Sequence, residues 1–288
     1  MKALAEFILR GRLQALVVAL IGSFFPLISS AAIALVSLCK GAKEGTLLFL
    51  WVSLALVLAQ RAGAENSLLT AVSISSLGIM VFTASVHRVL ASWQWTLLAT
   101  VLVAVICAQG FGLFMGSSVT ALVATAQEML NAVTSEEQTR SSVSLTESMV
   151  LGLIATILAV GSVMSLMLAR WWQAGIKNPG GFQKEFHSFA IDANIAVMLI
   201  LVLIAGQFFS KNTQIWADLA ALPLLIAGIA LVHYVVKLFN QRKQWLAFLY
   251  AGIIMLRKPV TLILVVLGLT DSLIDLRSKL FGYKKPKV

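Results

Sequence analysis

The sequence predicts an all-α protein, a polytopic transmembrane helical bundle with about eight to ten membrane segments. Three observations favour this class: 59% of the 288 residues are hydrophobic, only 12% are charged, and long apolar runs alternate with short charged loops. Inside a bilayer no water is present to bond backbone N–H and C=O groups, so runs of this length satisfy them as helices. We therefore expect the protein to fold in lipid.

The overall charge of the chain indicates the same environment. The net charge is +10, and the mean hydropathy of +0.93 leaves too little polar surface for a soluble domain. Lysine and arginine gather on the cytoplasmic loops of membrane proteins, which accounts for the positive charge. The sequence lacks the basic stripe interleaved with aromatic residues that would indicate nucleic-acid binding. We expect one integral membrane domain over residues 1–288, with the lipid bilayer as a partner and no nucleic acid bound.

The apolar segments divide the chain at charged or turn-forming residues. Residues 1–12 are basic, as in a signal peptide, but the apolar run that follows continues to Cys39, which favours a retained anchor. The first and last segments are too long for one crossing, and each is interrupted by a proline, Pro26 or Pro259. The segments are 13–39, 46–60, 67–86, 95–115, 149–172, 191–209, 216–239 and 245–274.

The distribution of lysine and arginine favours a fold in which both long segments double back at their prolines. This arrangement leaves most of the 22 basic residues on the cytoplasmic side, as the positive-inside rule requires. It predicts broken or re-entrant helices at Pro26 and at Arg257, Lys258 and Pro259, and both termini in the cytoplasm of a bacterium with the protein in its inner membrane. The basic residues left outside are Arg61, Arg140, Lys211, Arg257 and Lys258.

Three polar stretches are expected between or after the membrane segments. A net-acidic outer loop covers about residues 116–148, with a short surface helix expected around 123–133. A cytoplasmic loop covers about residues 171–190, and a basic tail follows from about 277 to 288. Each half of a doubled-back segment has only about 12 to 15 residues, roughly 18–22 Å, so it must be re-entrant or packed among other helices.

Motifs that carry enzyme chemistry are mostly absent from the sequence. It has no phosphate-binding loop, no Gly-x-Ser-x-Gly elbow, no His-Glu-x-x-His and no Cys-x-x-Cys. Ser37-Leu-Cys-Lys40 matches Ser-x-x-Lys, but an isolated four-residue match at the end of an apolar run is a weak signal. Cys39 and Cys107 lie in apolar runs and indicate neither a disulfide nor a metal site. We therefore expect no enzyme, no catalytic residue, no cofactor and no metal.

The cytoplasmic loop carries the first candidate site. Asn178-Pro179-Gly180-Gly181 is a strong turn signal, because proline fixes φ and glycine permits positive φ. The sequence is compatible with an interfacial aromatic belt and a tight turn, and also with a docking elbow for a membrane or cytoplasmic protein partner. The candidate docking residues are Trp171, Trp172, Asn178, Pro179, Gly180, Gly181, Phe182, Glu185 and Phe186.

A second candidate is the polar cluster of Asp271, Asp275 and Arg277 near the C-terminus. On one continuous helix, Asp271 and Asp275 share a face with Lys279, at a spacing of four residues. A structural ion-pair cluster is one interpretation, and coupling to a cation or a partner is the other. The pair Arg257-Lys258 is expected in a short outer turn, although two charges inside the bilayer would indicate an anionic substrate.

These two candidates carry a resemblance to a known family. The run Asn178-Pro-Gly-Gly-Phe182-x-x-Glu185-Phe186 and the terminal Gly268-x-x-Asp271-x-x-x-Asp275-x-Arg277 resemble the YybS-like family of predicted bacterial membrane proteins, whose function is undefined. That family is distantly similar to the S components of energy-coupling-factor transporters, which capture vitamins or metal ions and work with ATPases. The resemblance implies a transporter-like fold with partner subunits, and no position matches a substrate motif.

Two functions are compatible with these observations. The first is a membrane protein with a transporter-like helical fold that binds or takes up a small solute of unknown identity with partner subunits, since broken helices often surround transport sites. The second is a non-catalytic membrane scaffold or assembly factor that acts through its basic cytoplasmic face.

Overall fold

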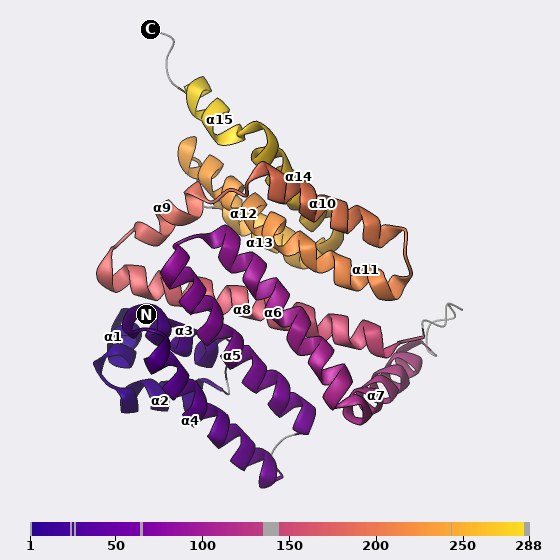
Figure 1. The fold of residues 1–288 in the computed structure, drawn as a ribbon. Coiled ribbons are helices and arrows are strands. Elements are labelled where there is room, and N and C mark those ends of the chain that lie inside the picture. The colour runs from indigo at the N-terminus through magenta and orange to yellow at the C-terminus, as the bar shows by residue number, and fades with distance from the viewer. Residues whose placement is uncertain are drawn as a thin grey trace. The chain divides into compact units, whose positions relative to one another are not determined.

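The computed structural model describes residues 2–23, 25, 27–63, 66–134, 144–242 and 244–284, and the regular structure in these ranges is entirely helical (Figure 1). Pro26 lies outside the described residues, so the prediction at that position is not tested. The helices are α1 (Lys2–Arg10), α2 (Arg12–Gly22), α3 (Ile28–Lys40), α4 (Ala42–Arg61), α5 (Ser67–Leu90), α6 (Trp93–Phe114), α7 (Gly116–Thr134), α8 (Glu147–Lys177), α9 (Gly181–Ser188), α10 (Ala193–Gln207), α11 (Lys211–Ala217), the 3₁₀ turn η1 (Asp218–Ala220), α12 (Ala221–Leu238), α13 (Gln244–Met255), α14 (Arg257–Ile274) and α15 (Leu276–Lys284).

Several helices are long and apolar enough to cross a bilayer. Among the described residues there are five, and α9 with α10, which meet at 68°, make a sixth if they are counted as one bent span. Many large apolar side chains on these helices face outward, Leu102 and Ile157 among them. Exposed apolar surface on this scale marks contact with lipid or a partner. The fold is therefore an all-helical one compatible with a membrane. The five spans are Ala42–Arg61, Ser67–Leu90, Trp93–Phe114, Glu147–Lys177 and Asn212–Leu238.

The chain divides into two compact units, which we describe separately. Unit 1 comprises Met1–Lys177 and Phe209–Trp216, and unit 2 comprises Asn178–Phe208 and Ala217–Val288. The single membrane domain that the sequence predicts stays a prediction.

Helix α3 lies at the centre of unit 1. It packs against α2, α4, α5 and α8, and every residue from Ser29 to Leu38 is buried. Its alanines and serines let the neighbouring helices approach closely, as small residues do in membrane bundles. At Gly45 of α4, an added Cβ would lie 1.9 Å from the Oγ of Ser37, so only glycine permits this contact.

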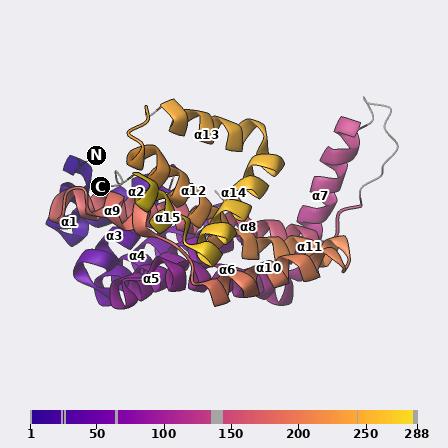
Figure 2. The ribbon, with the colours of Figure 1, turned by 90° about the horizontal axis from the view of Figure 1, so that it is seen from above.

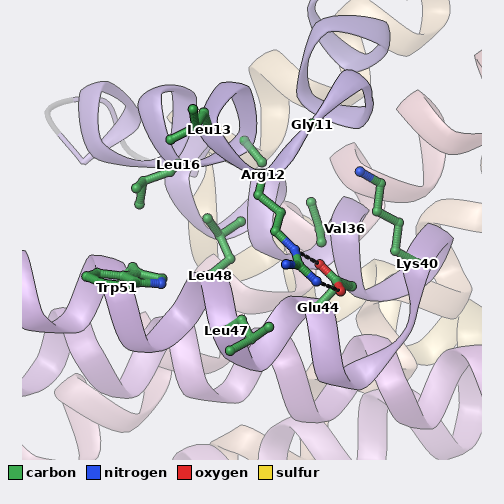
Figure 3. A pocket seen from close by; sticks show the side chains of 11 residues that line it. Gly11, Arg12, Leu13, Leu16, Val36, Lys40, Glu44, Leu47, Leu48 and Trp51 are labelled. Carbon is green, nitrogen blue, oxygen red and sulfur yellow. Dashed lines mark hydrogen bonds and ion pairs between the residues drawn. The ribbon is translucent and has the colours of Figure 1, made fainter.

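The first long apolar segment reverses direction between α2 and α3. Helix α2 ends at Gly22 and α3 begins at Ile28, after Leu27 in a left-handed conformation with φ of 76°. Arg12, the first residue of α2, forms an ion pair with Glu44, which lies just beyond the end of α3 (Figure 3). The start of α2 therefore lies near the end of α3, so the two helices run antiparallel.

Unit 2 is built around two helices that run in the same direction. An added Cβ at Gly228 of α12 would meet the carbonyl oxygen of Leu264 at 1.9 Å, and one at Gly268 of α14 would meet that of Leu224 at 2.2 Å. Lys258 at the start of α14 is close enough to Asp218, just before α12, to interact electrostatically. At the other end, the hydroxyl of Tyr234 on α12 bonds to the carbonyl of Arg277, just beyond α14, so the two helices are parallel. The two glycines let the backbones touch, as in the close crossings of membrane helices.

The last apolar segment also reverses. Helix α13 ends at Met255, Leu256 has non-helical backbone angles, and α14 then starts at Arg257 (Figure 2). Since α12 and α14 are parallel, α13, which connects them in the chain, runs in the opposite direction. Pro259 occupies the third position of α14, where a missing N–H breaks no helical hydrogen bond.

The expected loops contain more helix than the sequence suggested. Helix α7 covers 116–134, longer than the surface helix expected at 123–133, and residues 135–143 lie outside the described ranges. Helix α8 has 31 residues and extends to Lys177, beyond the expected end at Trp172. The tail forms α15 as far as Lys284.

Candidate functional site

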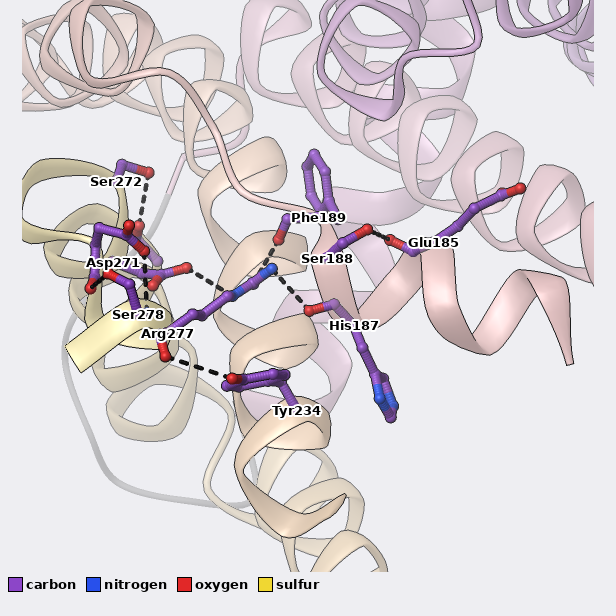
Figure 4. A network of polar contacts seen from close by, with 11 residues as sticks. Glu185, His187, Ser188, Phe189, Tyr234, Asp271, Ser272, Arg277 and Ser278 are labelled. Carbon is purple, nitrogen blue, oxygen red and sulfur yellow. Dashed lines mark hydrogen bonds and ion pairs between the residues drawn. The ribbon is translucent and has the colours of Figure 1, made fainter. Parts of the chain in front are cut away.

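Arg277 of the polar-cluster candidate bonds to the end of α9, the helix that carries Phe182, Glu185 and Phe186 of the docking candidate (Figure 4). Its Nη1 donates to the carbonyl of His187 at 2.9 Å, and its Nη2 donates to the carbonyl of Phe189. Both carbonyls belong to the C-terminal end of α9, where four C=O groups lack helical partners and cations are favoured. Arg277 therefore caps α9. We call Arg277, Asp271, His187 and Phe189 the Arg277 latch.

Asp271 completes the latch from the last turn of α14. Its Oδ2 lies 3.0 Å from Nε of Arg277, and the two side chains are only 1% and 11% exposed. The contact lacks hydrogen-bond angles, so it is an ion pair held by charge. A buried carboxylate needs a compensating cation, and Arg277 supplies it. Tyr234 of α12 adds a hydrogen bond from its hydroxyl to the Arg277 carbonyl at 3.3 Å.

Asp275 interacts with Asp271 and Arg277 only electrostatically, without a short ion pair to Arg277. The continuous helix expected through residues 268–279 is wrong. Asp275 adopts a left-handed conformation with φ of 46° and ends α14. Its Oδ1 accepts from the N–H of Ser278 at 3.3 Å, so it caps the start of α15 as aspartate often does. Hydrogen bonding by the hydroxyl and then the N–H of Ser278 lowers the pKa of Asp275 below its ordinary value.

The turn predicted at residues 178–181 is present in unit 2. Gly180 has φ of 82°, a conformation that glycine adopts without strain, and the N–H of Gly181 donates to the carbonyl of Asn178 at 2.8 Å. Asn178, Pro179 and Gly180 are exposed, while Gly181 and Phe186 are buried. The exposed turn is the part of this loop that a partner can reach, and a docking role stays a prediction.

Phe186 packs into an aromatic cluster that sequence reasoning missed. Its ring meets His233 edge-on at 5.3 Å, and Phe182 stacks on Phe186 at 5.9 Å. Nδ1 of His233 lies 3.0 Å from the carbonyl of Ile229, which can only accept, so Nδ1 carries the proton. Nε2 then accepts from the hydroxyl of Tyr250 at 3.2 Å. Both ring nitrogens of His233 are therefore occupied by hydrogen bonds within the protein.

The two tryptophans of the docking candidate belong to unit 1 and differ from each other. Trp171 is exposed, whereas Trp172 is buried at 2% exposure. Successive residues on a helix point about 100° apart, so a pair of neighbours rarely shares one environment. Trp172 is therefore a core residue, which corrects its assignment to an interfacial belt.

The basic pair at the start of α14 is exposed. Arg257 and Lys258 lie at the break after Leu256, and Lys258 is close enough to Asp218, at the start of α12, to interact electrostatically. The break therefore lies at the end of unit 2 where α12 begins.

A cavity of about 240 Å³ lies in unit 1 at the reversal between α2 and α3. Its polar wall consists of serines: Ser23 just after α2, Ser29 and Ser30 in the first turn of α3, and Ser73 and Ser76 on α5. We call it the serine cavity. The Oγ atoms of Ser30 and Ser76 lie 3.2 Å apart. Ser29 is buried and its Oγ has no hydrogen-bond partner among the described residues. Serines within an apolar run were the signal that could have found this cavity.

Basic residues collect at the opposite end of α3. The Nη1 of Arg88, at the end of α5, donates to the Ser37 carbonyl at 3.3 Å, and Gln173 near the end of α8 donates to that of Leu38 at 3.4 Å. The end of α3, the starts of α2 and α4 and the ends of α5 and α8 therefore meet. Each of them carries a cation: Arg12, Lys40, Lys43, Arg88, Arg170 and Lys177.

No cluster of three or more histidine, cysteine, aspartate or glutamate side chains within the described ranges has the arrangement of a metal site. In comparisons with known proteins, no family model, no curated protein and no solved structure matches this chain. The resemblance to the YybS-like family stays a prediction.

Proposed function

We propose that this chain is a multi-pass protein of the bacterial inner membrane that binds a small polar solute in the cavity between α2 and α3, as part of transport. In this proposal the membrane segments number about eight to ten, and the hairpins α2–α3 and α13–α14 enter the bilayer as broken or re-entrant elements.

The cavity at the reversal is the observation that carries the proposal. The start of α3 presents backbone N–H groups that have no helical partner, and the helix dipole makes this end electropositive. The unpartnered hydroxyl of Ser29 lies in the same wall. Broken helices whose N-terminal ends face a polar cavity are a common form of solute site in membrane transporters.

The donors in the wall indicate the kind of solute. Hydroxyl and N–H groups bind carbonyl or carboxylate oxygens, and the described residues around the cavity include no lysine, arginine, aspartate or glutamate. A volume of about 240 Å³ admits a small molecule, since one water occupies roughly 30 Å³. We expect a small solute rich in acceptor oxygens. The sequence has no nucleotide motif, so active uptake would require partner subunits.

The cation-rich end of unit 1 indicates how this unit is oriented in the membrane. Six basic residues at five helix ends face one side, and the positive-inside rule assigns that side to the cytoplasm. The reversal at residues 23–27 then lies toward the middle of the bilayer, because α3 has only 13 residues, about 20 Å in length. The N-terminus is cytoplasmic in this orientation, and we propose the same side for the C-terminus because its tail is basic.

A substitution that fills the cavity tests the proposal. An added Cβ at Gly161 meets nothing within 4 Å, so Gly161→Leu extends into the space without a backbone clash. We would screen amino acids, sugars, nucleosides and water-soluble vitamins for a rise in the melting temperature of the purified protein. We expect Gly161→Leu to abolish the response, and Ser29→Ala to weaken affinity about two- to tenfold through one lost hydrogen bond.

Gly175→Leu is the matched control. It lies on the same helix, its added Cβ also meets nothing within 4 Å, and it does not line the cavity. The proposal fails if no solute in the panel stabilises the protein, or if Gly161→Leu responds to a stabilising solute as fully as Gly175→Leu.

A further inference from the structure

A second cavity in unit 1, of about 380 Å³, combines apolar walls with charged groups at one end. It lies among α2, α3 and α4, away from the serine cavity. Figure 3 shows Arg12, Lys40 and Glu44 at one side of the view, and Trp51 with Leu16 at the other. The remaining walls are aliphatic or small: Gly11, Leu13, Ala15, Val36, Leu47 and Leu48.

The charged end retains capacity for an anion. Arg12 binds Glu44 through Nε at 2.8 Å and through Nη2 at 2.6 Å, a two-pronged pair that fixes the guanidinium in place. Within the described part of the chain, Nη1 of Arg12 has no hydrogen-bond partner. Lys40 is exposed at the same rim. Two cations against one carboxylate leave this end with a net positive charge.

This second cavity is elongated along α4, and we call it the groove. Its length fits part of a fatty acyl chain. Glu44 and Trp51 lie seven residues apart on α4, which is roughly 10 Å at 1.5 Å per residue. That distance corresponds to the first part of an extended acyl chain. Leu13 and Trp51 are 75% and 60% exposed, so apolar surface continues from the charged rim along the groove.

We propose that this groove binds one anionic phospholipid, with its phosphate at Lys40 and Nη1 of Arg12 and one acyl chain along Leu47 toward Trp51. A water-soluble phosphate would use only the charged rim and leave the apolar walls wet. A zwitterionic lipid brings a cation to a rim that is already positive. Both charge and shape therefore favour an anionic lipid of the bilayer.

Competitive lipid retention tests the proposal. Detergent-purified protein is mixed with equal amounts of phosphatidylglycerol and phosphatidylcholine of identical chains, and bound lipid is counted by native mass spectrometry. We expect preferential retention of phosphatidylglycerol. Lys40→Gln should weaken that retention about fivefold, the effect of one basic residue at an anionic surface. Leu47→Trp, which fills the groove, should reduce retention of both lipids.

Matched controls separate the groove from general surface charge. Lys43→Gln removes an exposed cation from the first turn of α4, three residues after Lys40 and outside the groove. Leu50→Trp adds the same bulk as Leu47→Trp at an outward position of α4. We expect neither to change lipid retention. Equal retention of the two lipids, an equal loss in Lys43→Gln and Lys40→Gln, or an unaffected Leu47→Trp would overturn the proposal. Displacement of the lipid by millimolar glycerol 3-phosphate would assign the rim to a soluble anion instead. None of these outcomes depends on the serine cavity.

Discussion

The hairpins α2–α3 and α13–α14 arise from the same sequence pattern, a long apolar run interrupted near its middle by proline. Their environments differ. Helix α3 is buried from Ser29 to Leu38 inside unit 1, whereas α13, all of whose residues are described, has no buried residue. Small side chains let other helices surround α3, while α13 carries large outward groups such as Phe248 and Ile254. The interruption predicts where a helix breaks, and side-chain size decides whether the halves become core.

The two hairpins are accordingly stabilised by different forces. Packing around α3 holds the first, while the second depends on the glycine crossing of α12 with α14 and on the Arg277 latch at the far end of α14. Substitutions that disturb only the packing around α3, or only the latch, should therefore affect the stability of one unit and not of the other.

The largest effect is expected for Arg277→Met. It leaves the carboxylate of Asp271 buried without its cation and removes the cap of α9, which should cost about 3–5 kcal/mol in the free energy of unfolding. Unfolding by sodium dodecyl sulfate, followed by circular dichroism, measures it. Lys279→Met, an exposed cation on α15, is the control and should change little. If the double variant Asp271→Asn with Arg277→Met is no more stable than Arg277→Met alone, the ion pair is not the cause.

A smaller effect is expected from enlarging alanines in the two hairpins. Ala34 of α3 is fully buried, so Ala34→Leu overpacks the core of unit 1 and should cost about 1–3 kcal/mol. Ala247 of α13 is exposed, and Ala247→Leu should stay within about 0.5 kcal/mol of the parent. The same unfolding measurement compares them. Equal costs at both positions would contradict the difference in burial.

The smallest effect concerns pH. Asp275 has a pKa below its ordinary value because Ser278 bonds to it, so its ionised form contributes stability above the unfolded pKa. That contribution is lost as pH falls through the lower, folded pKa. We expect acid titration of α15 helicity, followed by NMR, to show a step below about pH 4 that Asp275→Asn lacks. A step that persists in the variant would assign it to another group.

Local features of the sequence predicted local structure well. The turn at 178–181 and the break before α14 lie where proline and glycine predicted them, because these residues act on their own backbone and its neighbours. The first apolar run is also broken, between α2 and α3, but Pro26 itself lies outside the described residues. The latch could not be predicted, because Arg277 of α15 and His187 of α9 are 90 residues apart and the sequence does not show that these two helices meet. The expected pairing of Asp275 with Lys279 assumed one continuous helix, and the left-handed Asp275 breaks it.

The length of helix α8 matters if it crosses a bilayer as proposed. Its 31 residues extend about 46 Å, against a hydrocarbon thickness of about 30 Å, so in an upright crossing roughly ten residues would lie outside the hydrocarbon. The end from Arg170 to Lys177 is suited to this, with two cations and the exposed indole of Trp171. In bilayers of different hydrocarbon thickness, a different number of residues at this end would be immersed. The helix would then accommodate hydrophobic mismatch without a change in tilt.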